Sequence, residues 1–235
     1  MVLATKGLRL TSSRLDSPSR IEQICRSLAR CYRSPRLGNK CNPLDELVYI
    51  ILSTRSRSQG YQGLYRAVKR AYPRWEGLAE KRQLGGLARI LEPGGLSRLK
   101  AGQVTAIVRT LRQRFGYATL SPLRYLDDAA AEEFLVGLPG VGKKVAKCVL
   151  MYSLGRKVLP VDVHVHRVAQ RLGMRTKRRP DTSQDLIEAQ VPPHLRYGFH
   201  VNAIAHGRAA CLPRFPRCGD CCISRWCRYL TSTTR

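Results

Sequence analysis

Lys144 and Asp162 stand 18 residues apart and are of types that can do covalent chemistry. A neutral lysine amine can act as a nucleophile and form an imine. A carboxylate nearby can stabilise a developing positive charge and assist proton transfers. We expect a helix start, partial burial and the neighbouring cations Lys143 and Lys147 to disfavour the charged form of Lys144, as attack requires.

The same two residues also have simpler interpretations. Lys144 is of the type that contacts phosphates at a protein surface, and Asp162 is a good N-cap for the helical pattern that begins at Val163. Residue type alone favours these simpler interpretations, so a catalytic role needs further support.

The turn before Lys144 has the form of an anion-binding site. Gly140 and Gly142 stand two apart around Val141, and a helical pattern begins at Lys143. Free N–H groups at a helix start bind anions, and the missing Cβ atoms let a nucleic-acid backbone come close. A bare G-x-G pattern is weak support, because many such glycines merely close turns.

Five of the nine cysteines lie between Cys211 and Cys227, whereas the other four are dispersed. This asymmetry argues against a disulfide framework, because a local cluster in an intracellular protein usually holds a metal or an iron–sulfur centre. Cys25, Cys31 and Cys148 fall in apolar helical patterns, and we expect them to pack in the core.

The chain has 42 Lys and Arg residues against 16 Asp and Glu, a formal net charge of +26 over 235 residues. A surface this positive attracts polyanions before any specific contact forms, which makes nucleic acid the leading partner. Hydrophobic residues make up 43% of the chain, so the composition is that of a globular protein and excludes intrinsic disorder.

No apolar run approaches the roughly 18 residues that cross a bilayer, and no signal-peptide core is present. We therefore expect a protein without membrane association that is cytoplasmic, and close to the nucleoid, in a bacterium. Residues 1–16 form a basic tail that we expect to be flexible, and their scarcity of acidic residues leaves organelle targeting open.

The hydrophobic pattern is helical nearly throughout, which predicts an all-α protein. The segment 43–52 is apolar on almost every side and should lie at the centre of a helical lobe. Only Val158–Val161 resembles a strand. The other helices are expected to begin after the pair Ser17-Pro18, near 59, near 78, at a Ser97 N-cap, at Asp127 or Asp128, at Lys143, at Asp162, near 183 and near 195.

One segment makes the comparison with a known family specific. Residues 138–173, LPGVGKKVAKCVLMYSLGRKVLPVDVHVHRVAQRLG, closely resemble the endonuclease III branch of the helix-hairpin-helix DNA glycosylases. The resemblance extends from about Leu44 to Cys227 and includes the turn Gly95–Ala101 and the segment His206-Gly207-Arg208. Several ordered, independent matches make coincidence an inadequate explanation.

The resemblance implies a function for the residues around the turn. Lys144 and Asp162 would be the catalytic pair. An imine on Lys144 would acidify the C2′ proton, so that β-elimination of the 3′ phosphate follows base removal. The turn residues Gly140, Val141, Gly142 and Lys143 would contact DNA.

The resemblance also implies a cofactor near the C-terminus. Cys211, Cys218, Cys221 and Cys227 have the spacing C-x6-C-x2-C-x5-C, which holds a [4Fe-4S] cluster in that family. Tetrahedral zinc is the competing metal, although zinc sites more often pair two short knuckles. Cys222 fits no ligand position.

The sequence departs from the family in the loop after the first core helix. Arg55 stands where better-known members carry a glutamine that fills the gap left by a flipped-out nucleotide, and Ser58 stands where they carry an aspartate. We expect Arg55 and Arg57 to contact DNA, Arg55 by filling the gap; the simpler interpretation is that both only neutralise phosphates. The lesion preference of the family cannot be transferred through this loop.

The helical pattern predicts an all-α protein, and the resemblance implies a two-lobed DNA glycosylase of the helix-hairpin-helix fold with a C-terminal iron–sulfur cluster loop. Residues 37–158 would form the lobe with Lys144, and residues 17–36 together with 159–235 would form the lobe with Asp162 and the cluster. DNA would lie across the cleft between them.

The function we expect is base-excision repair by a monomeric glycosylase with abasic-site lyase activity, acting by default on oxidised pyrimidines. Its partner would be double-stranded DNA that contains a damaged or mismatched base or an abasic site. The alternatives are a monofunctional glycosylase of G·T and G·U mismatches and a non-catalytic protein that binds damaged DNA.

Overall fold

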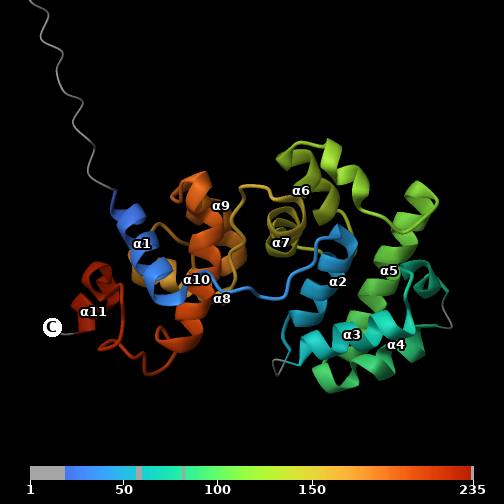
Figure 1. Cartoon of the computed structure of the whole chain (residues 1–235), viewed down its shortest axis with the longest axis horizontal. Coiled ribbons are helices and arrows are strands. Elements are labelled where there is room, and N and C mark those ends of the chain that lie inside the picture. The colour runs from blue at the N-terminus through green and yellow to red at the C-terminus, as the bar shows by residue number, and fades with distance from the viewer. Residues whose placement is uncertain (1–18, 57–59, 81–82, 234–235) are drawn as a thin grey trace, which may run out of the picture.

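The computed structural model describes residues 19–56, 60–80 and 83–233, and within these ranges every regular element is helical (Figure 1). The all-α prediction is therefore confirmed. The α-helices are α1 (Arg20–Tyr32), α2 (Pro43–Ser53), α3 (Tyr61–Ala71), α4 (Gln83–Leu91), α5 (Ser97–Phe115), α6 (Asp128–Val136), α7 (Lys143–Leu154), α8 (Val163–Arg171), α9 (Pro180–Ala189), α10 (Arg196–Ala209) and α11 (Arg228–Thr233). Short 3-10 helices are η1 (Trp75–Leu78), η2 (Glu92–Gly94), η3 (Ser121–Tyr125), η4 (Pro193–Leu195) and η5 (Ser224–Trp226).

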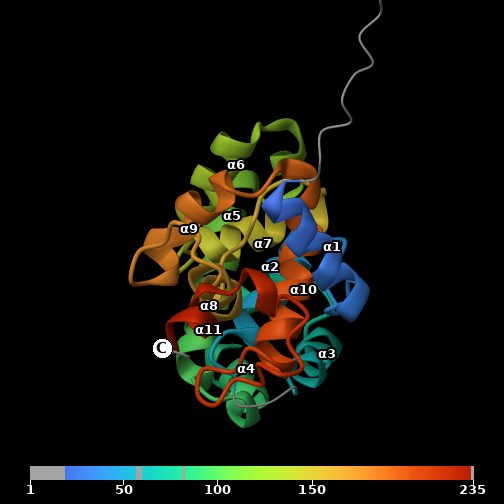
Figure 2. The same ribbon diagram turned by 90° about the vertical axis from the view of Figure 1, so that its left-hand side faces the viewer.

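Two hydrophobic cores divide the helices into the two halves seen in Figure 1. The first core gathers buried side chains from α2 to α7, and the second gathers those of α1, α8, α9 and α10 with Ile223. α1 reaches the second core because it packs along α10, beside which it lies in Figure 2. The exact lobe boundaries expected from the sequence stay a prediction.

Helix α2 is central to the first core because almost all of its residues are buried. The side chain of Asn42 caps its start by accepting hydrogen bonds from the backbone N–H groups of Leu44 and Asp45, and Pro43 occupies the first helical position. α2 packs directly on α7, the helix that follows the glycine turn. One of its buried residues is charged: Glu46 is fully buried.

Several expected helix boundaries were wrong for local reasons. α1 is capped by Ser19 through a capping box with Glu22, one residue beyond the expected pair, whose own residues lie outside the described part of the chain. α5 is preceded by Leu96 in a left-handed conformation (φ 54°), so Ser97 is its first residue and not its cap. Asp127, in contrast, caps α6 as expected, because its side chain accepts from Ala130 N.

Further differences lie in the second half of the chain. α9 begins at Pro180, earlier than expected, because proline suits a first helical position. Val158–Val161 is an extended connection and forms no strand within the described residues. Cys31 is exposed on α1, so its expected place in the core was wrong, whereas Cys25 and Cys148 are buried. No helix in the described ranges is long and apolar enough to cross a membrane.

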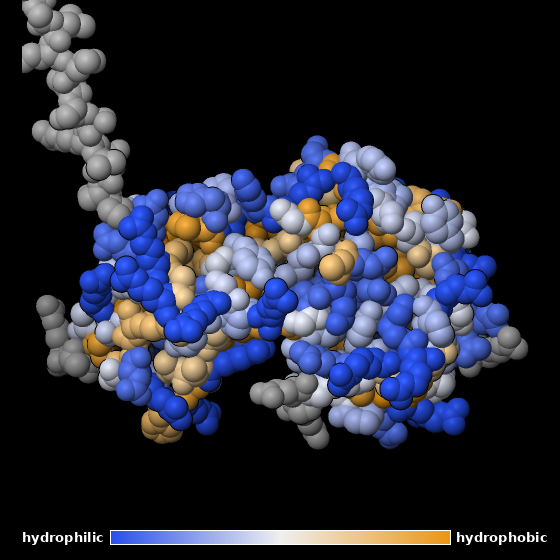
Figure 3. Space-filling model, viewed as in Figure 1, coloured by the Kyte–Doolittle hydropathy of each residue, from blue (hydrophilic) through white to orange (hydrophobic). Residues whose placement is uncertain are grey.

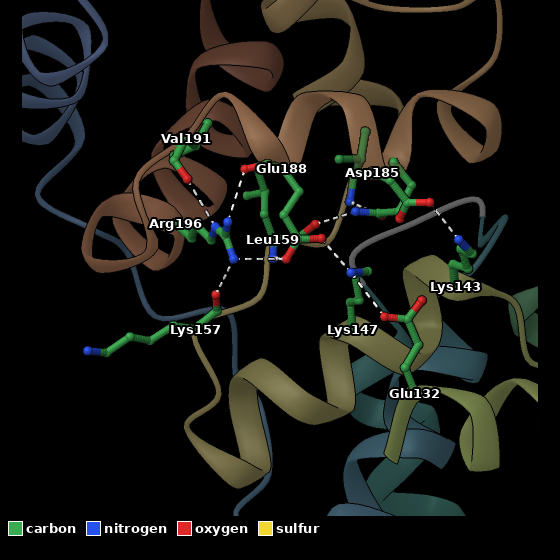
Figure 4. Close-up of polar contacts among 11 residues, drawn as sticks. Glu132, Lys143, Lys147, Lys157, Leu159, Asp185, Glu188, Val191 and Arg196 are labelled. Carbon is green, nitrogen blue, oxygen red and sulfur yellow. Dashed lines mark hydrogen bonds and ion pairs between the residues drawn. The ribbon is translucent and has the colours of Figure 1, made fainter. Parts of the chain in front are cut away.

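The two halves are joined by a network of buried charges, drawn in Figure 4. Lys147 of α7 forms ion pairs with Glu132 of α6, at 3.0 Å, and with Glu188 of α9. Glu188 also accepts hydrogen bonds from the backbone N–H of Leu159, at 3.0 Å, and from Arg196, at 3.2 Å. Charged side chains from the two halves therefore meet at a largely buried site.

Helix α9 also fixes the connection that leads to Asp162. Gln184 accepts a hydrogen bond from Val161 N at 2.9 Å and donates one to the carbonyl of Leu159. Together with Glu188, it holds both sides of the segment 159–161. The position of the next residue along the chain, Asp162, thus depends on α9.

We expect Glu188→Ala to lower the free energy of unfolding by about 3 kcal/mol or more, because it leaves the buried Lys147 ammonium short of a partner. Urea denaturation measures this change. The matched control is Asp181→Asn on the same helix, which removes only an exposed ion pair with Arg179 and should cost less than about 1 kcal/mol. Equal losses in the two variants would contradict a structural role for the network.

Candidate active site

A cavity of about 780 Å³ opens between the two halves and brings Lys144 and Asp162 to one site. Its walls come from both cores, with Tyr49, Lys144 and Tyr152 on one side and His164 and His200 on the other. The surface in Figure 3 is hydrophilic over both halves and is notched between them at its lower edge. The fold thus brings two residues that are 18 positions apart in the sequence to the same cavity.

Lys144 is positioned by the start of α7. Gly142 is the N-cap and offers no side chain to the first-turn N–H groups, which remain open to an anion. Gly140 has φ 69°, and its carbonyl accepts a hydrogen bond from Gln103 of α5 at 2.9 Å. A Cβ at Gly140 would lie 2.9 Å from that same side chain, so both the backbone conformation and the packing require glycine.

The expected DNA-contacting residues of this turn differ in what they can present. The side chain of Val141 is buried, so only its backbone could reach a ligand. The side chain of Lys143 is half-exposed and pairs with Asp185 of α9 at 2.6 Å. Gly142 and Lys143 line the cavity beside Lys144.

Asp162 occupies the start of α8 and caps it. Its Oδ1 accepts hydrogen bonds from the N–H groups of His164, at 2.9 Å, and Val165, at 2.8 Å. Its other oxygen, Oδ2, has no hydrogen bond to any residue that the structure describes. The capping role is real, and it leaves one carboxylate oxygen for a ligand in the cavity.

The charge state of Lys144 differs from the expectation. Burial lowers its pKa, but Cys148 and Asp162 raise it, and the pKa lies above the ordinary value of lysine overall. The charge effect of Cys148 requires a thiolate, whereas a neutral Cys148 sulfur can only accept a weak hydrogen bond from the ammonium. Because burial raises the pKa of the Cys148 thiol to about 11, this thiol is neutral near pH 7. Asp162, with a smaller contribution from Glu46, is then the negative charge that holds the proton on Lys144.

The two cations expected to disfavour that proton are themselves neutralised. Lys143 is paired with Asp185, and Lys147 with Glu132 and Glu188 (Figure 4). The expectation that they repel the Lys144 ammonium was therefore wrong. The sequence could not show this, because the paired residues of α9 lie about 40 positions further along the chain.

Two aromatic side chains add neutral polar groups to the cavity wall. His200 is buried, and its Nδ1 bonds to the carbonyl of Pro160 at 2.8 Å. Burial lowers the pKa of His200 to about 4, so its ring is neutral and Nε2 is an acceptor. The ring of Tyr152 packs 5.8 Å from that of His200, and its hydroxyl has no hydrogen-bond partner among the described residues.

The loop after α2 places Arg55 at the mouth of the cavity. Arg55 is exposed, lines the cavity and has φ 48°, a conformation that costs energy for a non-glycine residue. Lys100 of α5 is buried and holds this loop, because its ammonium donates to the Leu52 carbonyl and to Ser56 Oγ at 2.9 Å each. Arg57, the other arginine expected here, lies outside the described residues.

Leu96, at the start of α5, is a residue that the sequence analysis did not single out. It combines φ 54° with an exposed apolar side chain, and Lys100 in the first turn of the same helix ties it to the Arg55 loop. Exposed apolar side chains beside basic loops are suited to insertion between bases. The only sequence signal was a leucine between a glycine and a helix start.

The four expected cluster ligands all lie in the segment that follows α10. Cys221 interacts electrostatically with Cys211, Cys218 and Cys227. Arg171 donates to Cys211 Sγ at 3.1 Å, and His206 Nε2 lies 3.6 Å from Cys221 Sγ. Among the described residues, no three His, Cys, Asp or Glu side chains form a group that could hold a single metal ion.

The loop has few other means of holding its shape. Of the described residues from 211 to 231, Ile223 is the only one that is buried after the helix end. The thiol of Cys222, which fits no ligand position, interacts with that of Cys31 on α1. A four-thiolate cofactor fits this segment because the segment lacks a core of its own.

A family model described as HhH-GPD superfamily base excision DNA repair protein matches residues 48–193. Endonuclease III of Thermotoga maritima is 28% identical to this chain over 209 residues, which cover 89% of this chain and 92% of that protein. Endonuclease III of Escherichia coli K12 is 28% identical over 193 residues, covering 81% and 86%. A putative DNA glycosylase of Arabidopsis thaliana is 31% identical over 169 residues, covering 70% and 56%.

Solved structures share the fold. A trapped covalent intermediate of endonuclease III with DNA superposes with a TM-score of 0.75 at 24% identity, covering 90% of this chain and 95% of that one. A thermostable thymine-DNA glycosylase superposes with a TM-score of 0.74 at 21% identity and the same coverage. The helix-hairpin-helix glycosylase fold expected from the sequence is thereby confirmed.

The double role of Asp162 can be separated by two substitutions. Asp162→Ala should lower the free energy of unfolding by about 1 kcal/mol through loss of the cap, whereas Asp162→Asn should cost only a few tenths because asparagine caps equally well. Thermal or urea denaturation measures both. An alanine variant as stable as the asparagine variant would show that the cap contributes nothing.

Proposed function

The chain belongs to the HhH-GPD superfamily of base excision DNA repair proteins and is a DNA glycosylase of the endonuclease III type, and from this premise we propose that it is bifunctional. In this proposal it removes a damaged base, by default an oxidised pyrimidine, and then cleaves the abasic site through an imine on Lys144. The observation that carries the proposal is that Lys144 and the unpaired Oδ2 of Asp162 share one cavity.

The first step is base removal. The Lys144 amine forms a bond to C1′ as the bond from C1′ to the base nitrogen breaks, and the base leaves with the electron pair. An ammonium cannot attack, so Lys144 must first give up a proton. The Asp162 carboxylate can accept this proton through Oδ2, because it lies in the same cavity and can act as a base. The Asp162 carboxylate otherwise stabilises the positive charge that spreads over the sugar.

The second step is strand cleavage. Opening of the sugar ring leaves an imine between Lys144 and C1′, which acidifies the C2′ proton. Removal of that proton by a base forms a double bond between C2′ and C3′ and expels the 3′ phosphate. Water then hydrolyses the imine and returns the free lysine.

Double-stranded DNA would be held on both sides of the cavity. The open N–H groups after Gly142 would bind a phosphate. The Lys143 ammonium would leave its ion pair with Asp185 and bind a DNA phosphate in its place. Arg55 would fill the gap left by the flipped nucleotide, with Leu96 inserted beside it. The proposed unit of action is a monomer, because the cavity is complete within one chain.

The second candidate is a monofunctional mismatch glycosylase, favoured by the raised pKa of Lys144. As a lasting ammonium, Lys144 could not form an imine, and water would have to attack C1′ in its place. The likeness to a thymine-DNA glycosylase is compatible with this reaction but extends only to the fold.

We propose that Cys211, Cys218, Cys221 and Cys227 hold a [4Fe-4S] cluster. The cluster would staple the loop of residues 211–227 against α8, where Arg171 already donates to Cys211. Arg214, Arg217 and Arg225 would then be presented toward DNA from a fixed loop.

Borohydride trapping tests the lysine assignment. Wild type should become attached to duplexes with an abasic site and cleave them, and Lys144→Ala should lose both reactions while still binding DNA. Asp162→Asn, which keeps the cap, should slow base removal by roughly a hundredfold or more. Lys177→Ala is the matched control, since this exposed lysine does not line the cavity.

Duplexes that contain thymine glycol, dihydrouracil, G·T or G·U identify the lesion in the same assay. Base release without trapping or cleavage would establish the monofunctional alternative. If the protein binds these duplexes and abasic DNA tightly but reacts with none of them, the alternative of a non-catalytic protein that binds damaged DNA is the one supported.

Metal analysis tests the cofactor. The purified protein should be brown and carry about four iron and four sulfide per chain, and Cys221→Ala should lose both. Cys222→Ala, its neighbour, should keep them because Cys222 is not a ligand. A colourless protein with one zinc per chain would refute the cluster.

A further inference from the structure

Glu46 is a buried carboxylate that the proposed reaction does not use. It lies on α2, whose other core residues are apolar, and it is fully buried. One of its oxygens accepts a hydrogen bond from Asn39 Nδ2, and the other accepts one from Lys40 N at 2.6 Å. Each oxygen thus has one hydrogen-bond donor, and no cationic side chain of the described residues forms an ion pair with the carboxylate.

Several of the groups with which Glu46 interacts lie on α7. α2 packs against α7, and Glu46 interacts electrostatically with Lys144, Cys148 and Tyr152 on that helix. The ammonium of Lys40, the other nearby cation, lies over the rings of Tyr49 and Tyr65 at 4.5 and 4.8 Å from their centroids. Glu46 lies on the same face of α2 as Tyr49, Ile50 and Ser53, which line the cavity together with Lys144.

We propose that Glu46 is a positioning residue for Lys144, whose buried charge on α2 stabilises the Lys144 ammonium in addition to Asp162 and so makes the free amine scarcer. This inference deepens the proposed function and rests on it for its catalytic meaning. No bond to Glu46 forms or breaks.

The two carboxylates near Lys144 would then have different tasks. Asp162 faces the cavity, where its free oxygen can turn to a substrate. Glu46 is closed off by α2 and by its two hydrogen bonds, so its charge stays in place whether or not a substrate is bound. A lysine held between them would stay protonated in the empty enzyme, where a free amine would react with unwanted electrophiles.

The titratable groups that interact most with this pair, among the described residues, lie on α2 and just before it, on α3, on α7, on α10 and at the start of α8. Cys148 and Tyr152 are neutral near pH 7, because burial raises the pKa of both, and His200 is neutral because burial lowers its pKa. The remaining charges are Asp162 and Lys40. The groups that interact with Glu46 or Lys144 are Lys40, Tyr49, Tyr65, Cys148, Tyr152, Asp162 and His200.

The test measures the free amine of Lys144 directly, by its rate of acetylation with acetic anhydride between pH 5.5 and 9, read by peptide mass spectrometry. The exposed Lys177 is the internal reference. In Glu46→Gln, Lys144 should react faster than in wild type by roughly threefold or more above pH 7, because a stabilising negative charge is gone. The ratio should fall toward one as the pH drops through 6, since burial raises the pKa of Glu46 to about 6 and the wild-type carboxyl becomes protonated over this range.

Asp45→Asn is the matched control, because it removes the neighbouring carboxylate of the same helix, which faces Lys69 and Trp75, and should leave the ratio at one. A ratio of one at every pH for Glu46→Gln would overturn the proposal. So would a change of the same size at every pH, which is the result expected from a purely structural disturbance. If Glu46→Gln does not fold, Glu46→Leu removes the charge without leaving a polar atom opposite Lys40 N.

Borohydride trapping over the same pH range separates this inference from the proposed function. Faster trapping by Glu46→Gln above pH 7 supports both. If wild type shows no trapping while the acetylation ratio behaves as expected, the lyase proposal fails and the role of Glu46 stands.

Discussion

The buried ion pair between Lys147 and Glu188 is the contact on which the arrangement of the site depends. Lys147 follows Lys144 on α7 by less than one helical turn, and Glu188 with Gln184 fixes the segment that ends at Asp162. With the exposed pair of Lys143 and Asp185, this contact between α7 and α9 constrains the distance between the two residues that would act on the sugar. Because breaking a buried pair leaves an uncompensated charge, the two halves are held far more firmly than exposed ion pairs would hold them.

The few acidic residues of the chain are used largely in contacts within the protein. The chain has only 16, and many of those described serve a local structural purpose. Glu22, Asp127 and Asp162 cap helices, while Glu132, Glu188 and Asp185 pair with the lysines of α7. The excess of arginines is thus left without acidic partners at the surface, where it favours a polyanion.

Two residues near the mouth of the cavity have strained backbone conformations. Arg55 and Leu96 are non-glycine residues with positive φ, and both belong to turns that Lys100 ties together from the inside. Such conformations persist only where the surrounding structure imposes them, and they concentrate at sites that bind ligands. Here a buried lysine supplies that constraint, since its ammonium replaces lost water with two hydrogen bonds to the Arg55 loop.

The sequence alone determined the helices, the glycine turn and the cap at Asp162, because each depends on residues only a few positions apart. Caps, periodic apolar faces and the φ preference of glycine are local interactions, and so the all-α class could be predicted. Where a local signal was ambiguous, as at the start of α5, the prediction was wrong, because Ser97 is the first residue of the helix and not its cap. The roles of Lys144, Asp162 and the four cysteines stay predictions that the geometry supports.

What only the tertiary structure decided is the electrostatics. Lys143 and Lys147 are neutralised by acidic residues of α9, and the buried charge of Glu46 on α2 interacts with Lys144. Charges interact through space and through the dielectric around them, and neither quantity can be read from a linear order of residues.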